Sequence, residues 1–344
     1  MNGISPEFHP TMDVIPGDVV NQILKGLAPS LIDVVLEAYQ LHEQKKTINP
    51  DSYFLRYPDK PQNRIIALPA AVRDGVCDVS GIKWIASYPD NVKEGVARAS
   101  AVIVLNDNQR GYPFAFMEAA TISSARTAAS AVLGARMSKP TKAAKTVSFI
   151  GAGIIARSIA DQFKADSWTI ESVLVHDQSE ASATALATHC ETNLGWAAEL
   201  MGLETALAAD VVVFATNAGT PYVLDPTTFR PGQCVLNISL RDLGPEIILG
   251  AQNIFDDVEH CLKANTSPHL AEQLSNGRDF VGGTIAAVAR GEVKLTGDKP
   301  IVYSPFGMGI LDLVLAKKIY DHAIALNLSQ PVDNFFGAFE RWRT

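Results

Sequence analysis

The stretch Lys145-Thr146-Val147-Ser148-Phe149-Ile150-Gly151-Ala152-Gly153-Ile154-Ile155-Ala156-Arg157 decides the fold. It predicts a buried parallel strand that passes through a Gly-x-Gly-x-x-Ala turn into a helix. In such a turn Gly151 permits the tight bend, Gly153 lets the backbone approach a pyrophosphate, and Ala156 lets the helix pack closely on the strand. The helix N-terminus would then offer unpaired N–H groups and a positive dipole end to the phosphates.

A second predicted strand strengthens the case for a nucleotide site. The segment Ser172-Val173-Leu174-Val175-His176 ends in Asp177, where an acidic side chain accepts hydrogen bonds from an adenosine ribose. Asp177 would repel a ribose 2′-phosphate, and neither Gln178 nor Ser179 is an arginine. The sequence therefore predicts NAD as the cofactor. For the glycine pattern alone, the alternative is a tight strand-to-helix turn that binds no ligand.

Length and composition indicate a globular protein of two domains. The chain has 344 residues, 47% of them hydrophobic, and its 29 basic and 37 acidic residues give a net charge of −8. Without a polybasic run, nucleic acid and anionic membranes are poor candidate partners. The four cysteines lack metal-type spacing, so we expect reduced thiols, no metal site and a cytoplasmic location.

The alternation of strands and helices after residue 139 predicts the domain organisation. We assign residues 139–311 to an NAD-binding Rossmann domain with a doubly wound parallel sheet, an α/β fold. Residues 12–138 and 312–344 are assigned to an α+β domain for substrate binding and dimerisation. The apolar helix expected over Gly309–Leu326 would pack back on this first domain. Residues 1–11 read as an unstructured leader outside the native sequence.

Within the first domain, the pattern predicts two helices, a set of strands and a third helix. The helices fall between Val14 and Gln44 with a break near Gly26, and between Glu118 and Met137. Turns are expected at prolines and at an Asn/Asp cluster: Pro58, Pro61, Pro69, Pro89 and Asn106-Asp107-Asn108. The strands expected between these turns are 52–57, 64–68, 79–87 and 101–106.

Charged residues in apolar or small-residue settings are the candidates for chemistry. Lys83 lies in an apolar strand, where it is either an exposed edge lysine or a cleft residue suited to carboxylate binding or proton transfer. Arg126 lies among small residues on a helix. It either binds a ligand carboxylate through two hydrogen bonds or forms a salt bridge between two elements of the fold. Asp242 follows a buried strand, at the edge where open α/β sheets bind ligands. Its alternative role is that of an N-cap or turn aspartate.

Several motifs occur together in a fixed order: Gly81-Ile82-Lys83, Pro89-Asp90-Asn91, Gly111-Tyr112-Pro113 through Glu118 to Arg126-Thr127-Ala128-Ala129, and Gly151-Ala152-Gly153. With these motifs the chain resembles the ornithine cyclodeaminase/mu-crystallin family from about Val14 to Leu326. The resemblance implies a homodimer of two-domain subunits that binds NAD(P)(H) and a small amino-acid-derived substrate. The first domain, completed by the C-terminal helix, would carry the dimer interface.

The resemblance also implies roles by position. Arg56 and Lys83 match substrate-carboxylate residues, Arg126 matches the second substrate arginine, and Asp242 matches the catalytic acid/base. Lys83 is also a catalytic candidate because desolvation in a cleft would fit it to proton transfer. The expected cofactor contacts are Gly151, Gly153, Ile154, Ile155, Asp177, Thr216, Asn217 and Ser239.

One loop departs from the cyclodeaminases. They carry a Gly-Gly-Asp-x-Pro-Gly-Lys type loop, whereas this chain has Asn237-Ile238-Ser239-Leu240-Arg241-Asp242-Leu243-Gly244-Pro245-Glu246. This version is similar to the branch found in 2,3-diaminopropionate biosynthesis, which supplies siderophores and other natural products. That branch implies NAD-dependent oxidation of N-(2-amino-2-carboxyethyl)-L-glutamate to 2,3-diaminopropionate and 2-oxoglutarate. Arg98 or Arg241 would supply further positive charge for so acidic a substrate.

Three alternatives remain open at this point. Two are enzymes on the same scaffold, an ornithine- or lysine-type cyclodeaminase and a ketimine reductase. The third is a mu-crystallin-like binding protein that keeps the nucleotide fold without turnover.

Overall fold

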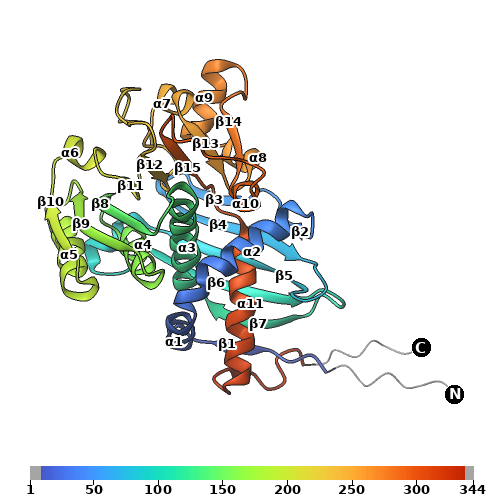
Figure 1. Ribbon diagram of the computed structural model, residues 1–344. Helices are drawn as coiled ribbons and strands as arrows, with labels where there is room; N and C mark the ends of the chain where they lie inside the picture. Colours follow the sequence, from blue (N-terminus) through green and yellow to red (C-terminus); the bar gives the residue numbers. More distant parts are fainter. Residues whose placement is uncertain (1–8, 338–344) are drawn as a thin grey trace. The chain divides into compact units, whose positions relative to one another are not determined.

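The chain forms two compact units, which a computed structural model describes for residues 9–337 (Figure 1). The leader predicted at residues 1–11 therefore lies largely outside the described residues. The first unit contains the described residues up to Leu27, Gln44–Ser123, and the described residues from Met308 onward. The second unit contains Ala28–Glu43 and Ser124–Gly307.

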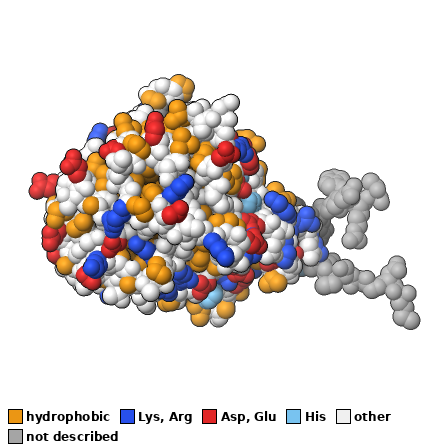
Figure 2. Space-filling view, turned by 45° about the horizontal axis from the view of Figure 1, so that its top comes forward, with side chains coloured by type: hydrophobic (Ala, Val, Ile, Leu, Met, Phe, Trp, Pro, Cys, Tyr) orange, Lys and Arg blue, Asp and Glu red, His pale blue; other side chains and the backbone are white. Residues whose placement is uncertain are grey.

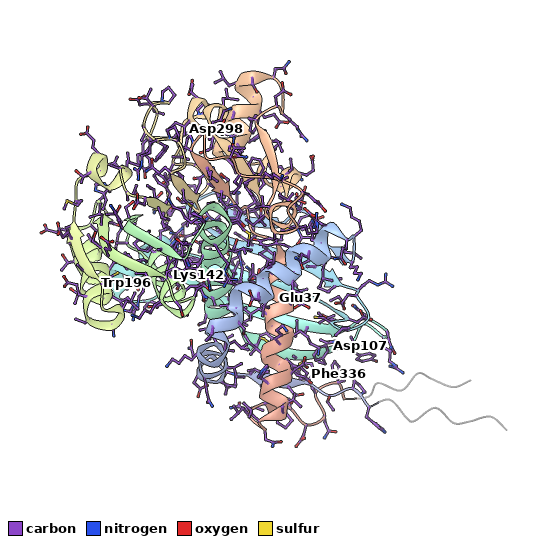
Figure 3. The ribbon with its side chains drawn as sticks, viewed as in Figure 1. Glu37, Asp107, Lys142, Trp196, Asp298 and Phe336 are labelled. Carbon is purple, nitrogen blue, oxygen red and sulfur yellow. The ribbon has the colours of Figure 1, made fainter. Side chains whose placement is uncertain are left out.

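The first unit is built on a mixed sheet with strand order β16-β1-β7-β6-β5-β4-β2, in which β3 also pairs with β4. The strands are β1 (Asp13–Ile15), β2 (Thr47–Ile48), β3 (Tyr53–Tyr57), β4 (Lys60–Val72), β5 (Val79–Ser87), β6 (Ala99–Asp107), β7 (Pro113–Glu118) and β16 (Gln330–Pro331). The turn predicted at Asn106-Asp107-Asn108 begins the hairpin between β6 and β7. There the Asp107 carboxylate (Figure 3) accepts the backbone N–H groups of Gln109 and Arg110.

Only one face of this sheet is fully covered. Side chains that alternate along β5, β6 and β7 are buried on one face and partly or fully exposed on the other. Helix α11 (Gly309–Ala325) packs on β4, β5 and β6, and also contacts α1 (Gly17–Leu27). The predicted return of the last helix to the first part of the chain is thus confirmed. Gly81 lets β5 and β6 approach closely, because a Cβ there would lie 2.2 Å from the Val104 carbonyl oxygen on β6.

One helical run is long and apolar enough to cross a membrane by length and composition alone. It covers Gly17–Glu43 and consists of α1, a 3₁₀ turn at Ala28–Ser30, and α2 (Leu31–Glu43). The 3₁₀ turn breaks the run near the predicted position. Most apolar side chains of both helices are buried, which is the pattern of core helices.

The second unit is built on an eight-stranded sheet with the order β10-β9-β8-β11-β12-β15-β13-β14 (Figure 1). Every neighbouring pair in it is parallel. The strands are β8 (Ala143–Ile150), β9 (Thr169–His176), β10 (Ala197–Leu200), β11 (Val211–Phe214), β12 (Cys234–Asn237), β13 (Gln252–Phe255), β14 (Val281–Thr284) and β15 (Ile301–Ser304). The chain steps outward from β8 to β10 and then returns to the other side of β8, as a doubly wound sheet requires. The predicted Rossmann-type fold class is confirmed.

Helices complete the second unit. They are α3 (Ala120–Ser138), α4 (Ile154–Ala165), α5 (Glu180–His189), α6 (Leu203–Leu207), α7 (Pro245–Gly250), α8 (Val258–Cys261), α9 (Ser267–Ser275) and α10 (Ile285–Ala289), with α2 described above and a π-helical turn at Cys190–Leu194. All four cysteines are free thiols, and three of them are buried.

On the face shown in Figure 2, lysine and arginine side chains lie interspersed with acidic ones.

The compact units divide the chain at points other than the predicted domain boundaries. Helix α2 and most of α3 belong to the second unit, although both precede residue 139. The reason is packing on the parallel sheet. The Tyr39 hydroxyl on α2 is hydrogen-bonded to Ser130 on α3, and Ser130 to Tyr303 on β15. Gly134 on α3 leaves room for the Tyr303 ring, since a Cβ there would lie 2.2 Å from a ring carbon.

Two of the predicted proline turns are wrong. Pro61 and Pro69 lie inside β4, which runs as one strand from Lys60 to Val72. On one edge β4 pairs with β3 only up to Ala67 and with β2 only from Ala71. Pro69 falls in the gap between these partners, where a missing N–H costs no ladder hydrogen bond on that edge.

Candidate functional site

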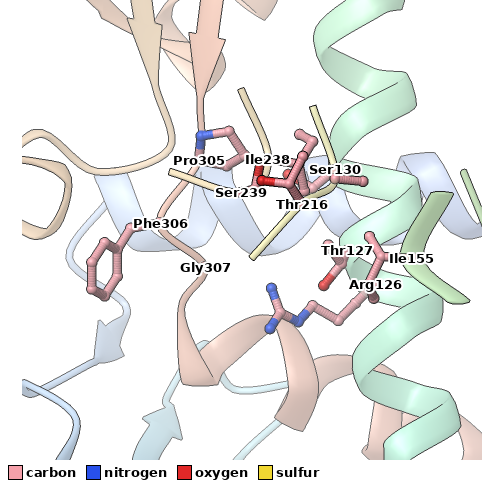
Figure 4. Close-up of a pocket in the computed structure, with 11 residues that line it drawn as sticks. Arg126, Thr127, Ser130, Ile155, Thr216, Ile238, Ser239, Pro305, Phe306 and Gly307 are labelled. Carbon is pink, nitrogen blue, oxygen red and sulfur yellow. The ribbon is translucent and has the colours of Figure 1, made fainter. Parts of the chain in front are cut away.

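A cavity of about 250 Å³ opens in the second unit at the carboxyl ends of its parallel strands (Figure 4). Its walls come from α3, from the first turn of α4, and from the segments that follow β11, β12 and β15. The lining residues are Arg126, Thr127, Ser130, Ile155, Ala215, Thr216, Ile238, Ser239, Pro305, Phe306 and Gly307. This is the edge at which open α/β sheets bind ligands.

The cavity lies beside the point where the strand order reverses, between β8 and β11. Gly151 follows β8 with φ +90°, and a Cβ there would lie 2.5 Å from the carbonyl oxygen of Ala215. Only glycine therefore permits the two strand ends to approach so closely. The Gly151 N–H donates to the carbonyl of His176 at 2.8 Å, which fixes the turn against β9.

The glycine turn fits a dinucleotide. Gly153 is the N-cap of the 12-residue helix α4 without a side-chain cap, and a Cβ at Gly153 would meet no described atom within 4 Å. The first N–H groups of α4 are thus open to a phosphate. At the end of β9, the Asp177 carboxylate accepts the N–H of Ala152 at 2.7 Å and that of Ser179 at 2.7 Å. Asp177 consequently lies at the turn, where a ribose hydroxyl would reach it.

Asp242 is fully buried, with 0% of its surface exposed. Its Oδ1 accepts the hydroxyls of Thr216 at 2.5 Å and Tyr222 at 3.0 Å, and its Oδ2 accepts the hydroxyl of Ser239 at 2.5 Å. Three hydroxyl donors stabilise the charged carboxylate in a dry setting. Burial, together with the negative charge of Asp242, raises the pKa of Tyr222 well above its usual range, so Tyr222 stays a donor. The predicted N-cap alternative is wrong, because Gly244 caps the following helix.

Arg126 extends from α3 toward the loop that follows β15 (Figure 4). Gly307 in that loop has φ +90°, and a Cβ there would lie 2.7 Å from Arg126 Nη1. The loop is held from behind by the buried Asp256, which accepts the N–H groups of Phe306 at 2.9 Å and Gly307 at 2.7 Å. The guanidinium is thereby packed directly against backbone, which limits the directions it can point.

Lys83 belongs to the first unit and is not an exposed edge lysine. Its side chain is 1% exposed and its ammonium donates to Asp312 Oδ2 at 2.6 Å and to Ser123 Oγ at 3.1 Å. Asp312 lies on α11 with a fully buried side chain. Because both charged groups are buried, each depends on the other as its partner.

Three arginines of the first unit gather at one end of its sheet. Arg56 on β3 pairs directly with Arg64 on β4, and Arg64 pairs directly with Ser87 on β5. Directly opposed side chains share a sheet face, where like charges repel. Arg98 approaches the same place, because its Nε donates to the Ser87 hydroxyl at 3.2 Å. Such a row of cations is suited to an anionic ligand.

The other predicted site residues have distinct positions. Ile155, Thr216 and Ser239 line the cavity, while Ile154 is an exposed apolar side chain at the first position of α4. Asn217 is exposed and does not line the cavity. Arg241 is held away by the carbonyl of Ala264, to which its Nε and Nη2 donate. Within residues 9–337, His, Cys, Asp and Glu side chains form no group of three or more that could hold a metal ion.

Sequence reasoning missed several supporting residues. Asp312 is an acid inside the apolar run Ile310-Leu311-Asp312-Leu313-Val314, and this interruption was the signal that it needs a buried cation. Asp256 had a weaker signal, an acid at the end of a buried strand. Tyr39, Ser130 and Tyr303 form a buried hydroxyl cluster that no spacing indicates. Burial raises the pKa of both tyrosines, so they remain neutral hydrogen-bonding groups.

Comparison with known proteins supplies the family. The model of the ornithine cyclodeaminase/mu-crystallin family matches residues 20–327. The chain belongs to the ornithine cyclodeaminase/mu-crystallin family. The resemblance inferred from the motifs is thereby confirmed.

Relatives within the ornithine cyclodeaminase/mu-crystallin family match along most of the chain. N-((2S)-2-amino-2-carboxyethyl)-L-glutamate dehydrogenase of Staphylococcus aureus is 32% identical over 86% of this chain and 91% of its own. The crystal structure of CmnK is 29% identical, with a TM-score of 0.84 over 96% of this chain and 100% of that chain. Thermococcus litoralis Delta(1)-pyrroline-2-carboxylate reductase, solved with NADH and L-proline, has a TM-score of 0.84 at 22% identity over 93% of this chain and 100% of its own, a likeness of fold.

Proposed function

We propose that the protein is an NAD-dependent dehydrogenase that oxidises the C–N bond of an N-substituted amino acid. The substrate is N-(2-amino-2-carboxyethyl)-L-glutamate, and the products are 2,3-diaminopropionate and 2-oxoglutarate. The observation that carries the proposal is the cavity of the second unit. It places a cation, Arg126, on one wall and a hydroxyl-bound carboxylate, Asp242, beneath another, next to a turn that fits a dinucleotide. The 32% identical relative supports the choice of substrate.

The cofactor in this proposal is NAD. Gly151, Gly153 and the N-terminus of α4 hold the pyrophosphate, and Asp177 accepts the ribose hydroxyls. Ile154 and Ile155 supply apolar contacts, and Thr216, Asn217 and Ser239 border the nicotinamide end. Held by these residues, NAD would supply the hydride acceptor for oxidation at the glutamyl α-carbon.

The cations orient the acidic groups of the substrate. Arg126 forms a fork with one carboxylate, a geometry that suits guanidinium. For Arg56 and Arg98 of the first unit we propose carboxylate binding as well, because the row that they form with Arg64 suits a ligand with more than one acidic group. We propose the same purpose for Lys83, which is ion-paired with Asp312. An ornithine side chain, which is cationic, would be repelled by such a row.

Asp242 acts as the acid/base of the reaction. It takes a proton from the substrate amine before the hydride departs, and the resulting imine is attacked by water. It then returns the proton to the leaving nitrogen, which frees 2,3-diaminopropionate from 2-oxoglutarate. Three hydroxyl donors fix the position of its two oxygens until the amine arrives.

Product analysis tests the proposal. The purified protein is incubated with NAD and N-(2-amino-2-carboxyethyl)-L-glutamate while absorbance at the NADH band and 2-oxoglutarate are followed. We expect both to rise in equal amounts. A cyclodeaminase would release ammonia from ornithine or lysine without net NADH, a ketimine reductase would oxidise NADH with a cyclic imine, and a binding protein would retain NAD without turnover. Each of these outcomes would replace the proposed function.

The protein acts as a homodimer in this proposal, through the open face of the first sheet. That face carries large apolar side chains, among them Tyr53, 69% exposed, and Trp84, 42% exposed, with Leu55 and Phe116 also exposed. These four share the face because they alternate with the buried residues of their strands or pair across them. Light scattering should give twice the chain mass for the wild type and a monomer for Trp84→Glu. A monomeric wild type would contradict the dimer.

A further inference from the structure

We infer that Ser239 relays protons between the substrate amine in the cavity and the buried carboxylate of Asp242. This inference deepens the proposed function and rests on it. It changes the role of Ser239, which sequence analysis had treated only as a cofactor contact. The acid/base group then reacts with the substrate through a hydroxyl that touches both.

The first observation is that Asp242 does not reach the cavity surface. The residue is fully buried and does not line the cavity. Both of its oxygens already accept a hydroxyl: Oδ1 accepts those of Thr216 and Tyr222, and Oδ2 accepts that of Ser239. A proton that travels between the cavity and this carboxylate therefore passes through one of three hydroxyl groups.

The second observation separates the three hydroxyls. Tyr222 does not line the cavity, whereas Thr216 and Ser239 do. Thr216 Oγ1 also accepts the backbone N–H of Ala218 at 3.1 Å, so one of its lone pairs holds the turn. Among the residues that the structure describes, Ser239 Oγ has Asp242 Oδ2 as its acceptor and receives no hydrogen bond. A hydroxyl has one proton and two lone pairs, so Ser239 can accept a proton from the cavity while donating its own.

The third observation is how firmly Ser239 is held. The backbone N–H groups of Ile238 and Ser239 both donate to the carbonyl of Phe214 at 3.1 Å, which ties the start of the loop to β11. Leu240 has φ +79°, a conformation rare for a residue with a side chain, and it turns the chain so that Asp242 returns beneath Ser239. The Ser239 hydroxyl is thereby fixed between the carboxylate and the cavity.

The relay balances in atoms and electrons. The substrate ammonium gives a proton to Ser239 Oγ as the original Ser239 proton moves to Asp242 Oδ2. The electron pair left on nitrogen forms the C=N bond when hydride leaves the α-carbon, and the oxidant is the nicotinamide dinucleotide of the proposed function. After water adds to the protonated imine, one water proton is released to solvent, and the proton on Asp242 returns through Ser239 to the leaving nitrogen. The second water proton passes to the freed amine as the C=O bond forms and the C–N bond breaks, and both groups are restored.

The test compares two variants that each remove one hydroxyl from Asp242. Ser239→Ala removes the relay, whereas Tyr222→Phe removes a donor that lies outside the cavity lining. At saturating NAD and substrate, Ser239→Ala should lower kcat by about 10²- to 10⁴-fold, the usual range for losing a proton-transfer group. Tyr222→Phe should lower it by less than about tenfold. Ser239→Thr, which keeps a hydroxyl at the same atom, should restore most of kcat.

Two further measurements identify the step. The rate of Ser239→Ala should fall more in D₂O than that of the wild type, because proton transfer then limits turnover. The Kd for NADH, measured by its fluorescence without substrate, should change far less than kcat, which excludes a collapsed cofactor site. Equal losses in Ser239→Ala and Tyr222→Phe, with equal solvent isotope effects, would overturn the relay while leaving the proposed function intact. A wild type that makes no NADH overturns the proposed function and the relay with it.

Discussion

Replacing Gly307 by alanine should separate the placement of Arg126 from the stability of the loop. Gly307 has φ +90°, and the added Cβ would lie 2.7 Å from Arg126 Nη1. Since the loop backbone is held by Asp256, the flexible guanidinium has to move. Arg126 would then meet the substrate carboxylate at the wrong distance and angle.

The expected magnitude follows from two separate costs. Adopting a left-handed backbone costs a residue with a side chain about 1–2 kcal/mol, which falls on stability. Losing a hydrogen bond to a charged group costs about 1.5–3 kcal/mol, which falls on substrate binding and its transition state. The second cost corresponds to a decrease of about ten- to hundredfold in kcat/KM.

Gly297→Ala is the matched control. Gly297 has φ +73° in the same unit, and its Cβ would meet nothing within 4 Å. In both variants an alanine has to adopt a left-handed backbone conformation, so their melting temperatures should fall by similar amounts. Steady-state kinetics with the N-substituted amino acid and NAD should show the loss of kcat/KM only in Gly307→Ala. If both variants keep the wild-type kcat/KM, Gly307 does not position Arg126 for the substrate.

Three further predictions use other parts of the molecule. Asp177→Arg should shift the ratio of kcat/KM for NAD and NADP toward NADP by tenfold or more, about 1.4 kcal/mol, because the ribose acid is gone; an unchanged ratio would refute its role. Lys83→Met leaves the Asp312 carboxylate buried without its cation, at a cost of about 3–5 kcal/mol. The double variant with Asp312→Leu should regain thermal stability but not turnover, and a double variant as unstable as the single one would contradict this. The hydrogen bond with Asp257 raises the pKa of His260 in the folded state. The pair therefore stabilises the fold fully at pH values below the His pKa of the unfolded chain, about 6.5. This stabilisation is lost as the pH rises through the higher pKa of the folded state. Asp257→Asn should therefore lower the melting temperature more at pH 6 than at pH 9, and equal losses would argue against the ion pair.

The nucleotide turn was predictable because its requirements are local. A turn with φ +90° and 2.5 Å of clearance needs glycine, so the sequence displays the constraint directly at Gly151. The strand–turn–helix order, the acid at Asp177 and the break near Gly26 follow from patterns within a few residues. The strand predicted over Val79–Ser87 matches β5 residue for residue, because its alternation and its flanking turns are both clear.

The supporting contacts were not predictable because they join distant parts of the chain. Lys83 and Asp312 are 229 residues apart, and the hydroxyls of Tyr39 and Tyr303 are 264 apart. The length of β4 was likewise not predictable, because Pro69 is tolerated inside it only where the partner strands β2 and β3 stop on either side. The depth of Asp242, which makes a serine intermediary necessary, also depends on packing that no local pattern reveals.

The bonds of Asp177 have a consequence for engineering. Its two oxygens accept hydrogen bonds from the backbone N–H groups of Ala152 and Ser179. The side chain that discriminates between the two nucleotides therefore also stabilises the loop that would bind them. Cofactor selectivity and rigidity of the loop therefore depend on the same residue. A redesign toward the phosphorylated dinucleotide would have to supply a new brace for those amides, or accept weaker binding of either coenzyme.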